Sequence, residues 1–242
     1  MKSPVEQFTI KTLVPLEAFG YDISFTNASL FMVLSVIVSS LFLYLGIKKS
    51  SLIPNRFQSS VELLYEFVSN MVKENVGTGG KKYFPFIFSL FMFILFGNLL
   101  GMIPYSYTFT SQIIVTITLA LIIFIGVTLI ALIKHKLKFF TFFFPSGVPI
   151  ALAPLLIPIE IISYLMRPVS LSVRLFANMM AGHTMMKVFG GFVISLGIVG
   201  GWLPLSFSVA LTGLEILVAF LQAYVFAILT CIYLNDALNL HH

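Results

Sequence analysis

The sequence has few charged residues. Asp, Glu, Lys and Arg make up 10% of its 242 residues, whereas soluble domains carry about 25%. Hydrophobic residues make up 59%, and the mean hydropathy is +1.03. A spanning helix uses about 20 apolar residues, so the chain has room for about five or six of them and none for a separate soluble domain. An integral membrane protein in contact with lipid is therefore predicted.

Other absences narrow the function. Cys231 is the only cysteine, which excludes a disulfide within the chain and a thiolate cluster from this chain alone. We expect no metal and no cofactor. The sequence has no Gly-x-x-x-x-Gly-Lys-Ser/Thr phosphate loop, so neither direct nucleotide binding nor nucleotide catalysis is expected. The net charge of +5 comes from Lys and Arg at the ends of apolar runs, where they set topology rather than bind nucleic acid.

Apolar runs with basic ends predict spanning helices. After an N-terminal segment of residues 1–28, these helices are predicted over residues 30–47, 83–103 and 113–133. If they alternate in direction, the basic clusters at 48–49, 81–82 and 134–138 fall on one side. The positive-inside rule makes that side the inner one and places the N-terminus outside.

Residues 55–76 have a different pattern. Val61, Val68 and Val72 follow helical spacing, and charged residues such as Glu62 and Glu66 lie between them. This amphipathic pattern predicts a helix at the membrane interface.

Residues 149–236 are predicted to form a hairpin of two long helices that carries the proton path. The helices are expected over about 159–190 and 203–234, each roughly 48 Å long at 1.5 Å per residue. Because the hydrocarbon layer is about 30 Å thick, such helices must be steeply inclined or kinked, for example at Pro168. The predicted fold is a single all-α membrane domain with about three spanning helices, one interfacial helix and this hairpin.

Ionisable side chains inside the apolar C-terminal part mark a candidate site. A charge at the centre of a membrane helix costs about 2.5 to 3.5 kcal/mol, so such residues normally face a partner or water. A guanidinium stays protonated in proteins, so Arg174 can act only through its fixed charge. The acidic and basic residues between positions 139 and 234 are Glu160, Arg167, Arg174, His183, Lys187 and Glu215.

Helical spacing sorts the polar residues into two groups. At 100° per residue, Arg174 shares a narrow stripe, within about 40°, with Glu160, Ser163, Arg167, Ser170 and Asn178. His183 lies on the opposite side of the same helix, about 14 Å along it. Glu215 and Gln222 are seven residues apart and share a face of the second helix, where they can meet polar groups of the first.

Each polar residue also has a purely structural interpretation. Arg167 and Lys187 can extend to lipid headgroups, and Ser163 and Ser170 can bond to their own helix. For His183, and for Asn178 and Gln222, the alternative is ordinary bonding between helices.

Four segments resemble subunit a of F-type ATP synthases. The longest is Ser-Val-Arg-Leu-Phe-Ala-Asn-Met-Met-Ala-Gly-His at 172–183. Residues 96–105, Glu215 with Gln222, and 232–237 extend the likeness over nearly the whole chain. The chain has His183 and Glu215 where many bacterial members have an acid and a histidine, which is similar to the mitochondrial and alphaproteobacterial branch. Gly101 stands where some relatives have an acid, so no acidic entrance is expected there.

The resemblance implies a non-catalytic, proton-translocating stator subunit. Its implied partners are a ring of c subunits, b-type subunits of the peripheral stalk, other ATP synthase subunits and membrane lipid. The implied location is a mitochondrial inner membrane or the plasma membrane of an alphaproteobacterium. Arg174 would be the essential arginine facing the ring, between two offset half-channels. The outer half-channel would contain Asn178, His183, Glu215, Gln222 and, at its entrance, Asn98; the inner one would contain Glu160, Ser163 and Ser170.

Two alternatives of other classes remain at this point. One is a self-contained secondary transporter in which a buried Arg174 binds an anionic substrate. The other is a membrane scaffold whose polar residues only hold helices together.

Overall fold

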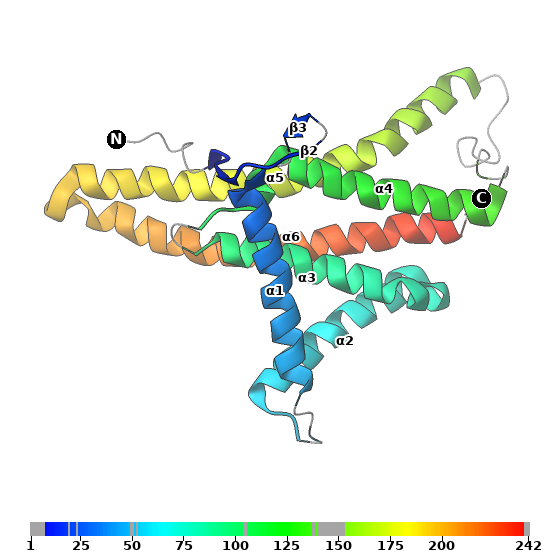
Figure 1. The fold of residues 1–242 in the computed structure, drawn as a ribbon, viewed down its shortest axis with the longest axis horizontal. Helices are drawn as coiled ribbons and strands as arrows, with labels where there is room; N and C mark the ends of the chain where they lie inside the picture. The colour runs from blue at the N-terminus through cyan, green and yellow to red at the C-terminus, as the bar shows by residue number, and fades with distance from the viewer. Residues whose placement is uncertain are drawn as a thin grey trace.

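The computed structural model describes residues 8–18, 20–22, 24–48, 51, 53–103, 106–136, 139 and 153–239. Five of its helices are long and apolar enough to cross a membrane, and Figure 1 shows how they are arranged. This confirms the predicted all-α integral membrane fold. The α-helices are α1 (Asn27–Ile47), α2 (Arg56–Val76), α3 (Phe84–Gly101), α4 (Ile113–His135), α5 (Ala153–Gly200) and α6 (Trp202–Leu238).

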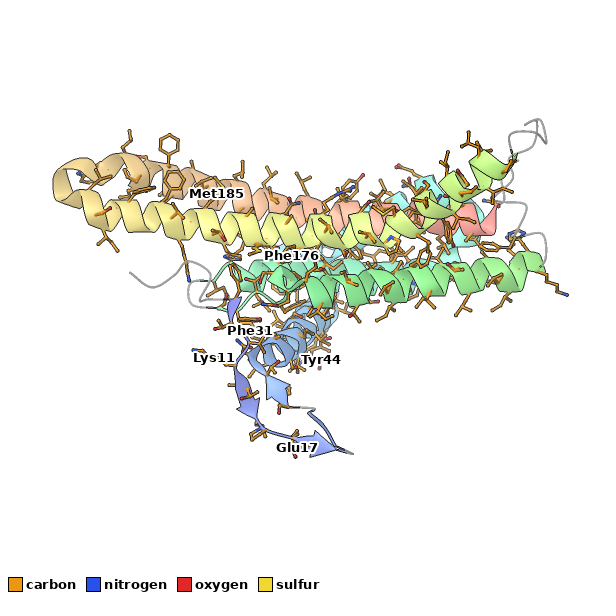
Figure 2. All side chains as sticks on the ribbon, turned by 90° about the horizontal axis from the view of Figure 1, so that it is seen from above. Lys11, Glu17, Phe31, Tyr44, Phe176 and Met185 are labelled. Atoms are coloured by element: carbon orange, nitrogen blue, oxygen red, sulfur yellow. The ribbon has the colours of Figure 1, made fainter. Side chains whose placement is uncertain are left out.

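Short strands precede α1, which the sequence did not predict. β1 (Thr12–Val14) pairs with β4 (Phe25–Thr26), and β2 (Glu17–Ala18) pairs with β3 (Tyr21–Asp22), both antiparallel. Figure 2 shows this segment, with Lys11 and Glu17, projecting from the helices. The Asn27 side chain bonds to the main chain of Thr9 and Lys11, which ties the segment to the start of α1.

Small residues set how α1 packs. Its buried positions are Ala28, Ser35, Ser39 and Gly46. A Cβ atom at Gly46 would lie 2.5 Å from Val61 Cγ2 of α2, so the absence of a side chain allows the two helices to approach closely. The large apolar residues of α1 are mostly exposed, for example Val33, Ile37 and Leu41, as expected for side chains that face lipid.

The helix α2 is amphipathic. Val61, Val68 and Val72 are buried, whereas Glu62 and Glu66 are exposed. Val61 meets Gly46 of α1, and Val68 and Val72 belong to the apolar core that includes Leu234 and Leu238 of α6. The 3-10 helix η2 (Gly77–Tyr83) then leads into α3.

The helices of the C-terminal hairpin are longer than the sequence predicted. α5 has 48 residues and α6 has 37, and residues 149–152 of the predicted hairpin lie outside the described residues. The first helix does not end at Gly190 and Gly191. Backbone groups in lipid need partners within their own helix, so a helix continues through glycines that no contact forces to turn. The direction changes near Gly197 instead, where φ is +63°, a value that favours glycine.

The hairpin is bent and runs at a steep angle to α1. Figure 1 shows α5 bending between its first part and the rest, which we attribute to Pro168 inside the helix. It also shows α1 crossing the direction of α5 and α6 steeply. Helices that cross in this way cannot all stand upright in one bilayer. Figure 1 also shows α3 and α4 running alongside the hairpin. If α1 is upright, the hairpin is therefore steeply inclined, and α3 and α4 are inclined with it.

Basic side chains gather where α6 ends. Lys134 Nζ donates to Leu238 O at 2.7 Å, and His135 Nε2 lies 3.0 Å from Ala237 O, so α4 supplies partners for the last carbonyls of α6. A Cβ atom at Gly79 of η2 would lie 3.7 Å from Leu238, which brings the basic segment 81–82 to the same end. The positive-inside rule predicts that this end faces the inner side. The 106–112 loop lies at the opposite ends of α3 and α4.

Candidate functional site

A buried histidine and a buried carboxyl group meet between α5 and α6. His183 Nε2 lies 3.6 Å from Glu215 Oε1, and their side chains are 9% and 3% exposed. Gly182 makes this approach possible, because a Cβ atom at residue 182 would lie only 2.7 Å from Glu215 Oε1. Neither carboxyl oxygen has a hydrogen-bond partner among the described residues. Burying such a group is costly unless it is paired, so its main stabilising contact is with the imidazole.

The loop between α3 and α4 supplies a third group to this pair. Thr108 Oγ1 lies 2.9 Å from His183 Nε2 and also donates to Gly101 O at 3.2 Å. Sequence reasoning missed Thr108. The available signal was an uncharged run of hydroxyl residues, which the structure buries at Thr108, Thr110 and Ser111.

Two glycines of α3 receive this loop. A Cβ atom at Gly97 would lie 2.4 Å from Phe109 Cζ, and one at Gly101 would lie 2.5 Å from Thr108 Oγ1. The glycines are four residues apart, so they lie on one face of α3. This spacing commonly lets two membrane helices approach closely. In this protein it gives space for the loop that includes the 3-10 helix η3 (Phe109–Ser111) to pack against α3.

Asn98 lies in the protein interior. Its side chain is 0% exposed, donates to Ala219 O of α6 at 3.3 Å and accepts from Thr110 at 2.9 Å. This burial arises because α3 turns Asn98 toward α6 and the buried loop. Asn98 links the loop to α6 on the same side of the protein as His183.

A second polar contact between the long helices lies closer to Arg174. Asn178 donates to Gln222 Oε1 at 2.8 Å, and Gln222 is buried. Glu215 and Gln222 therefore both face inward from α6, and each meets a polar residue of α5. The two contacts are separated by five residues on α5 and by seven on α6.

Arg174 is exposed. It makes no hydrogen bond or ion pair with any residue that the structure describes. It lies in the 44-residue apolar span 154–197, where an exposed charge is unfavourable unless another molecule supplies a partner.

Arg167 has partners within the chain, so it does not extend freely to headgroups. Its Nη1 atom lies 3.0 Å from Asp236 Oδ2, with side chains 23% and 32% exposed. Its guanidinium lies 5.2 Å from the ring centroid of Tyr164 and 5.1 Å from that of Tyr233. Arg167 therefore joins α5 to the last turns of α6. Lys187 is exposed, and nothing in the structure assigns it a role.

The remaining polar residues that share the Arg174 face of α5 are less buried than His183 and Glu215. Ser163 and Ser170 are exposed and Glu160 is half-buried. Within the described part of the chain, neither hydroxyl bonds to its own helix, whereas Ser172 bonds to Val169 O. All three lie before Arg174 in α5.

The N-terminal segment covers the site near His183. Gln112 Nε2 donates to Phe8 O at 2.7 Å, and the Phe8 ring meets the His183 ring edge-on at a centroid distance of 6.5 Å. Among the described residues, no three His, Cys, Asp or Glu side chains are grouped to hold a metal ion. The site contains two side chains that can take up and release protons, His183 and Glu215, and the permanently charged guanidinium of Arg174.

Comparison with known proteins assigns the chain to a family. Residues 29–235 match the model of the family described as ATP synthase A chain. The chain belongs to the ATP synthase A chain family. Relatives named ATP synthase subunit a include one from Pelagibacter ubique, 68% identical over 241 residues, which span 99% of each chain. Another from Rhodospirillum rubrum is 58% identical over 241 residues, which span 100% of each, and one from Rhizobium rhizogenes is 58% identical over 98% of this chain and 97% of its own.

Proposed function

We propose that the chain is the proton-translocating stator subunit of an F-type ATP synthase. Membership in the ATP synthase A chain family carries this conclusion. As such a subunit it is non-catalytic and works with other ATP synthase subunits. It passes several times through an energy-transducing membrane, and its alphaproteobacterial relatives favour the plasma membrane over the mitochondrial one. Family membership also decides against a self-contained transporter.

The partner of Arg174 is proposed to be a carboxyl group on another chain. The guanidinium is permanently charged, lies at membrane depth and has no ion-pair partner among the described residues. A carboxylate brought to it from outside would remove this unfavourable charge. A rotating ring of c subunits with one carboxyl group each would supply such partners in turn, and b-type subunits of the peripheral stalk would hold the chain against rotation.

The outer half-channel is proposed to follow the buried polar contacts. A proton would pass the Thr108 loop to His183 and Glu215, and then reach the Gln222 and Asn178 pair beside Arg174. This route is supported by its position, since the loop lies at the ends of α3 and α4 that are opposite the basic, inner side. Asn98 would support this route from the interior.

The inner half-channel is proposed to use Glu160, Ser163 and Ser170. These residues lie on the part of α5 toward the inner side, and their polar groups are free to meet water or a neighbouring subunit. Arg174 lies between the two groups, and its positive charge would repel a proton moving directly from one to the other. Rotation of the ring would then be the only route across.

The decisive experiment replaces Arg174 with Ala in the assembled ATP synthase in vesicles. ATP-driven proton pumping and passive proton leak are both measured, and subunit content confirms assembly. We expect coupled pumping to be lost. Arg56→Ala, at the exposed start of α2, is the matched control and should pump normally. Normal pumping by Arg174→Ala would refute the assignment and favour a scaffold.

A further inference from the structure

We propose that Thr108 is a positioning residue that keeps Nε2 of His183 directed toward Glu215 in both protonation states of the imidazole. This rests on the proposed function, because it assumes that His183 and Glu215 exchange protons. Thr108 lies 75 residues from His183 in the sequence, on a loop rather than on either long helix.

The position of Thr108 is fixed from several sides. Its side chain fits against Gly101, where even a Cβ atom would lie 2.5 to 2.9 Å from the threonine atoms. Thr108 is 4% exposed, and its carbonyl oxygen accepts from Ser111 Oγ at 2.6 Å. Because the loop packs against α3, Thr108 has a fixed position and can hold the imidazole ring in one orientation.

A hydroxyl group suits both states of the histidine. It has one proton to donate and two lone pairs that accept. When Nε2 carries a proton, Thr108 can accept from it and direct its own proton to Gly101 O, 3.2 Å away. When Nε2 is bare, the hydroxyl can rotate and donate to it across the same 2.9 Å. Gly101 O also accepts from Ser106 Oγ at 2.8 Å, so it keeps a partner in either case.

The proposed proton step balances with this arrangement. The imidazolium of His183 breaks its Nε2–H bond, the proton forms an O–H bond on the Glu215 carboxylate, and a neutral imidazole protonated at Nδ1 remains. The Nε2 and Oε1 atoms are 3.6 Å apart, beyond the range of about 2.6 to 3.2 Å for direct transfer. The Nε2–H bond points at one acceptor at a time, so the proton must leave its hydrogen bond to Thr108 while the two groups approach by several tenths of an ångström. A ring that had rotated away would lose the contact with Glu215 altogether. Among the described residues, Glu215 is the charged group that contacts His183.

Two substitutions separate hydrogen bonding from packing. Thr108→Val keeps the shape and loses the hydroxyl, whereas Thr108→Ser keeps the hydroxyl and loses the methyl group. In assembled ATP synthase in vesicles, we expect Thr108→Val to reduce proton flux about tenfold to a hundredfold and Thr108→Ser to stay within about twofold of the parent. Thr118→Val is the matched control, because the Thr118 hydroxyl bonds only to its own helix. The reverse order, with Val tolerated and Ser defective, would overturn the proposal.

A double variant tests whether Thr108 acts through the His183 and Glu215 pair. In a Glu215→Gln background there is no carboxylate to receive the proton, so adding Thr108→Val should reduce flux little further. An equal further loss would show that the valine only damages packing, and would also overturn the proposal. Arg174→Ala keeps the two hypotheses distinct. If it abolishes coupling while Thr108→Val is tolerated, only this inference fails; if it pumps normally, the proposed function itself fails.

Discussion

The contact between Gly182 and Glu215 makes Gly182→Ala an informative perturbation. The added Cβ atom would lie 2.7 Å from Oε1, 3.0 Å from Cδ and 3.3 Å from Cγ of Glu215. Ordinary contact begins at 3.4 Å, so the carboxyl group must retreat from α5 by about 0.7 Å. Overpacking of this kind typically costs about 1 to 3 kcal/mol.

The expected functional effect is larger than the effect on folding. Alanine favours a helix over glycine by about 1 kcal/mol, which offsets part of the overpacking, so assembly should survive. The retreat lengthens the 3.6 Å separation from His183, and a misplacement of about 1 Å can reduce a rate about a hundredfold. We expect proton flux through assembled Gly182→Ala enzyme to fall about tenfold to a hundredfold.

The assay is proton flux in vesicles, normalised to assembled enzyme, with two controls. Gly190→Ala makes the same change on the same helix where a Cβ atom meets nothing within 4 Å, so it should behave as the parent. Glu215→Asp relieves the clash but draws the carboxyl group farther from His183, so it should not restore the flux when added to Gly182→Ala. If Gly182→Ala matches Gly190→Ala, the steric reasoning is wrong.

Two further predictions concern the ionisable residues. Glu215→Gln keeps the shape but loses the titrating group, so proton uptake should slow without loss of assembly; unchanged turnover from about pH 6 to 8 would contradict a proton-carrying role. Arg167→Ala removes the ion pair with Asp236 and two aromatic contacts. The free energy of unfolding should therefore decrease by about 1 to 2 kcal/mol, which would lower the unfolding temperature of the complex. An unchanged unfolding temperature would show that this contact does not hold α5 to α6.

Much of the fold follows from local patterns. Apolar runs bounded by lysines indicate the spanning helices, and the spacing of Glu215 and Gln222 places both on one face of α6. The end of α5 was mispredicted, because Gly190 and Gly191 are typical breaks in water but remain in a helix where lipid offers the backbone no other partner. The actual change of direction depends on the positive φ of Gly197, which no local pattern distinguishes from the neighbouring glycines.

The contacts of the site depend on residues that are far apart in the sequence. The partner of Arg167 is 69 residues away, and Thr108 meets His183 only because α3 seats its loop. Periodicity reports which face of a helix a residue occupies, but not which neighbour covers that face. The residues that resembled the family signature were therefore identified, while the threonine that contacts them was not.

The outward-facing guanidinium also bears on how the complex is built. A newly inserted chain would hold this cation against hydrocarbon until a neighbour covered it, and would draw water and headgroups inward to solvate it. Such a local defect is relieved only on docking, so the unassembled chain should be short-lived and a natural substrate for membrane proteases. Supplying the docking neighbour should lengthen its lifetime.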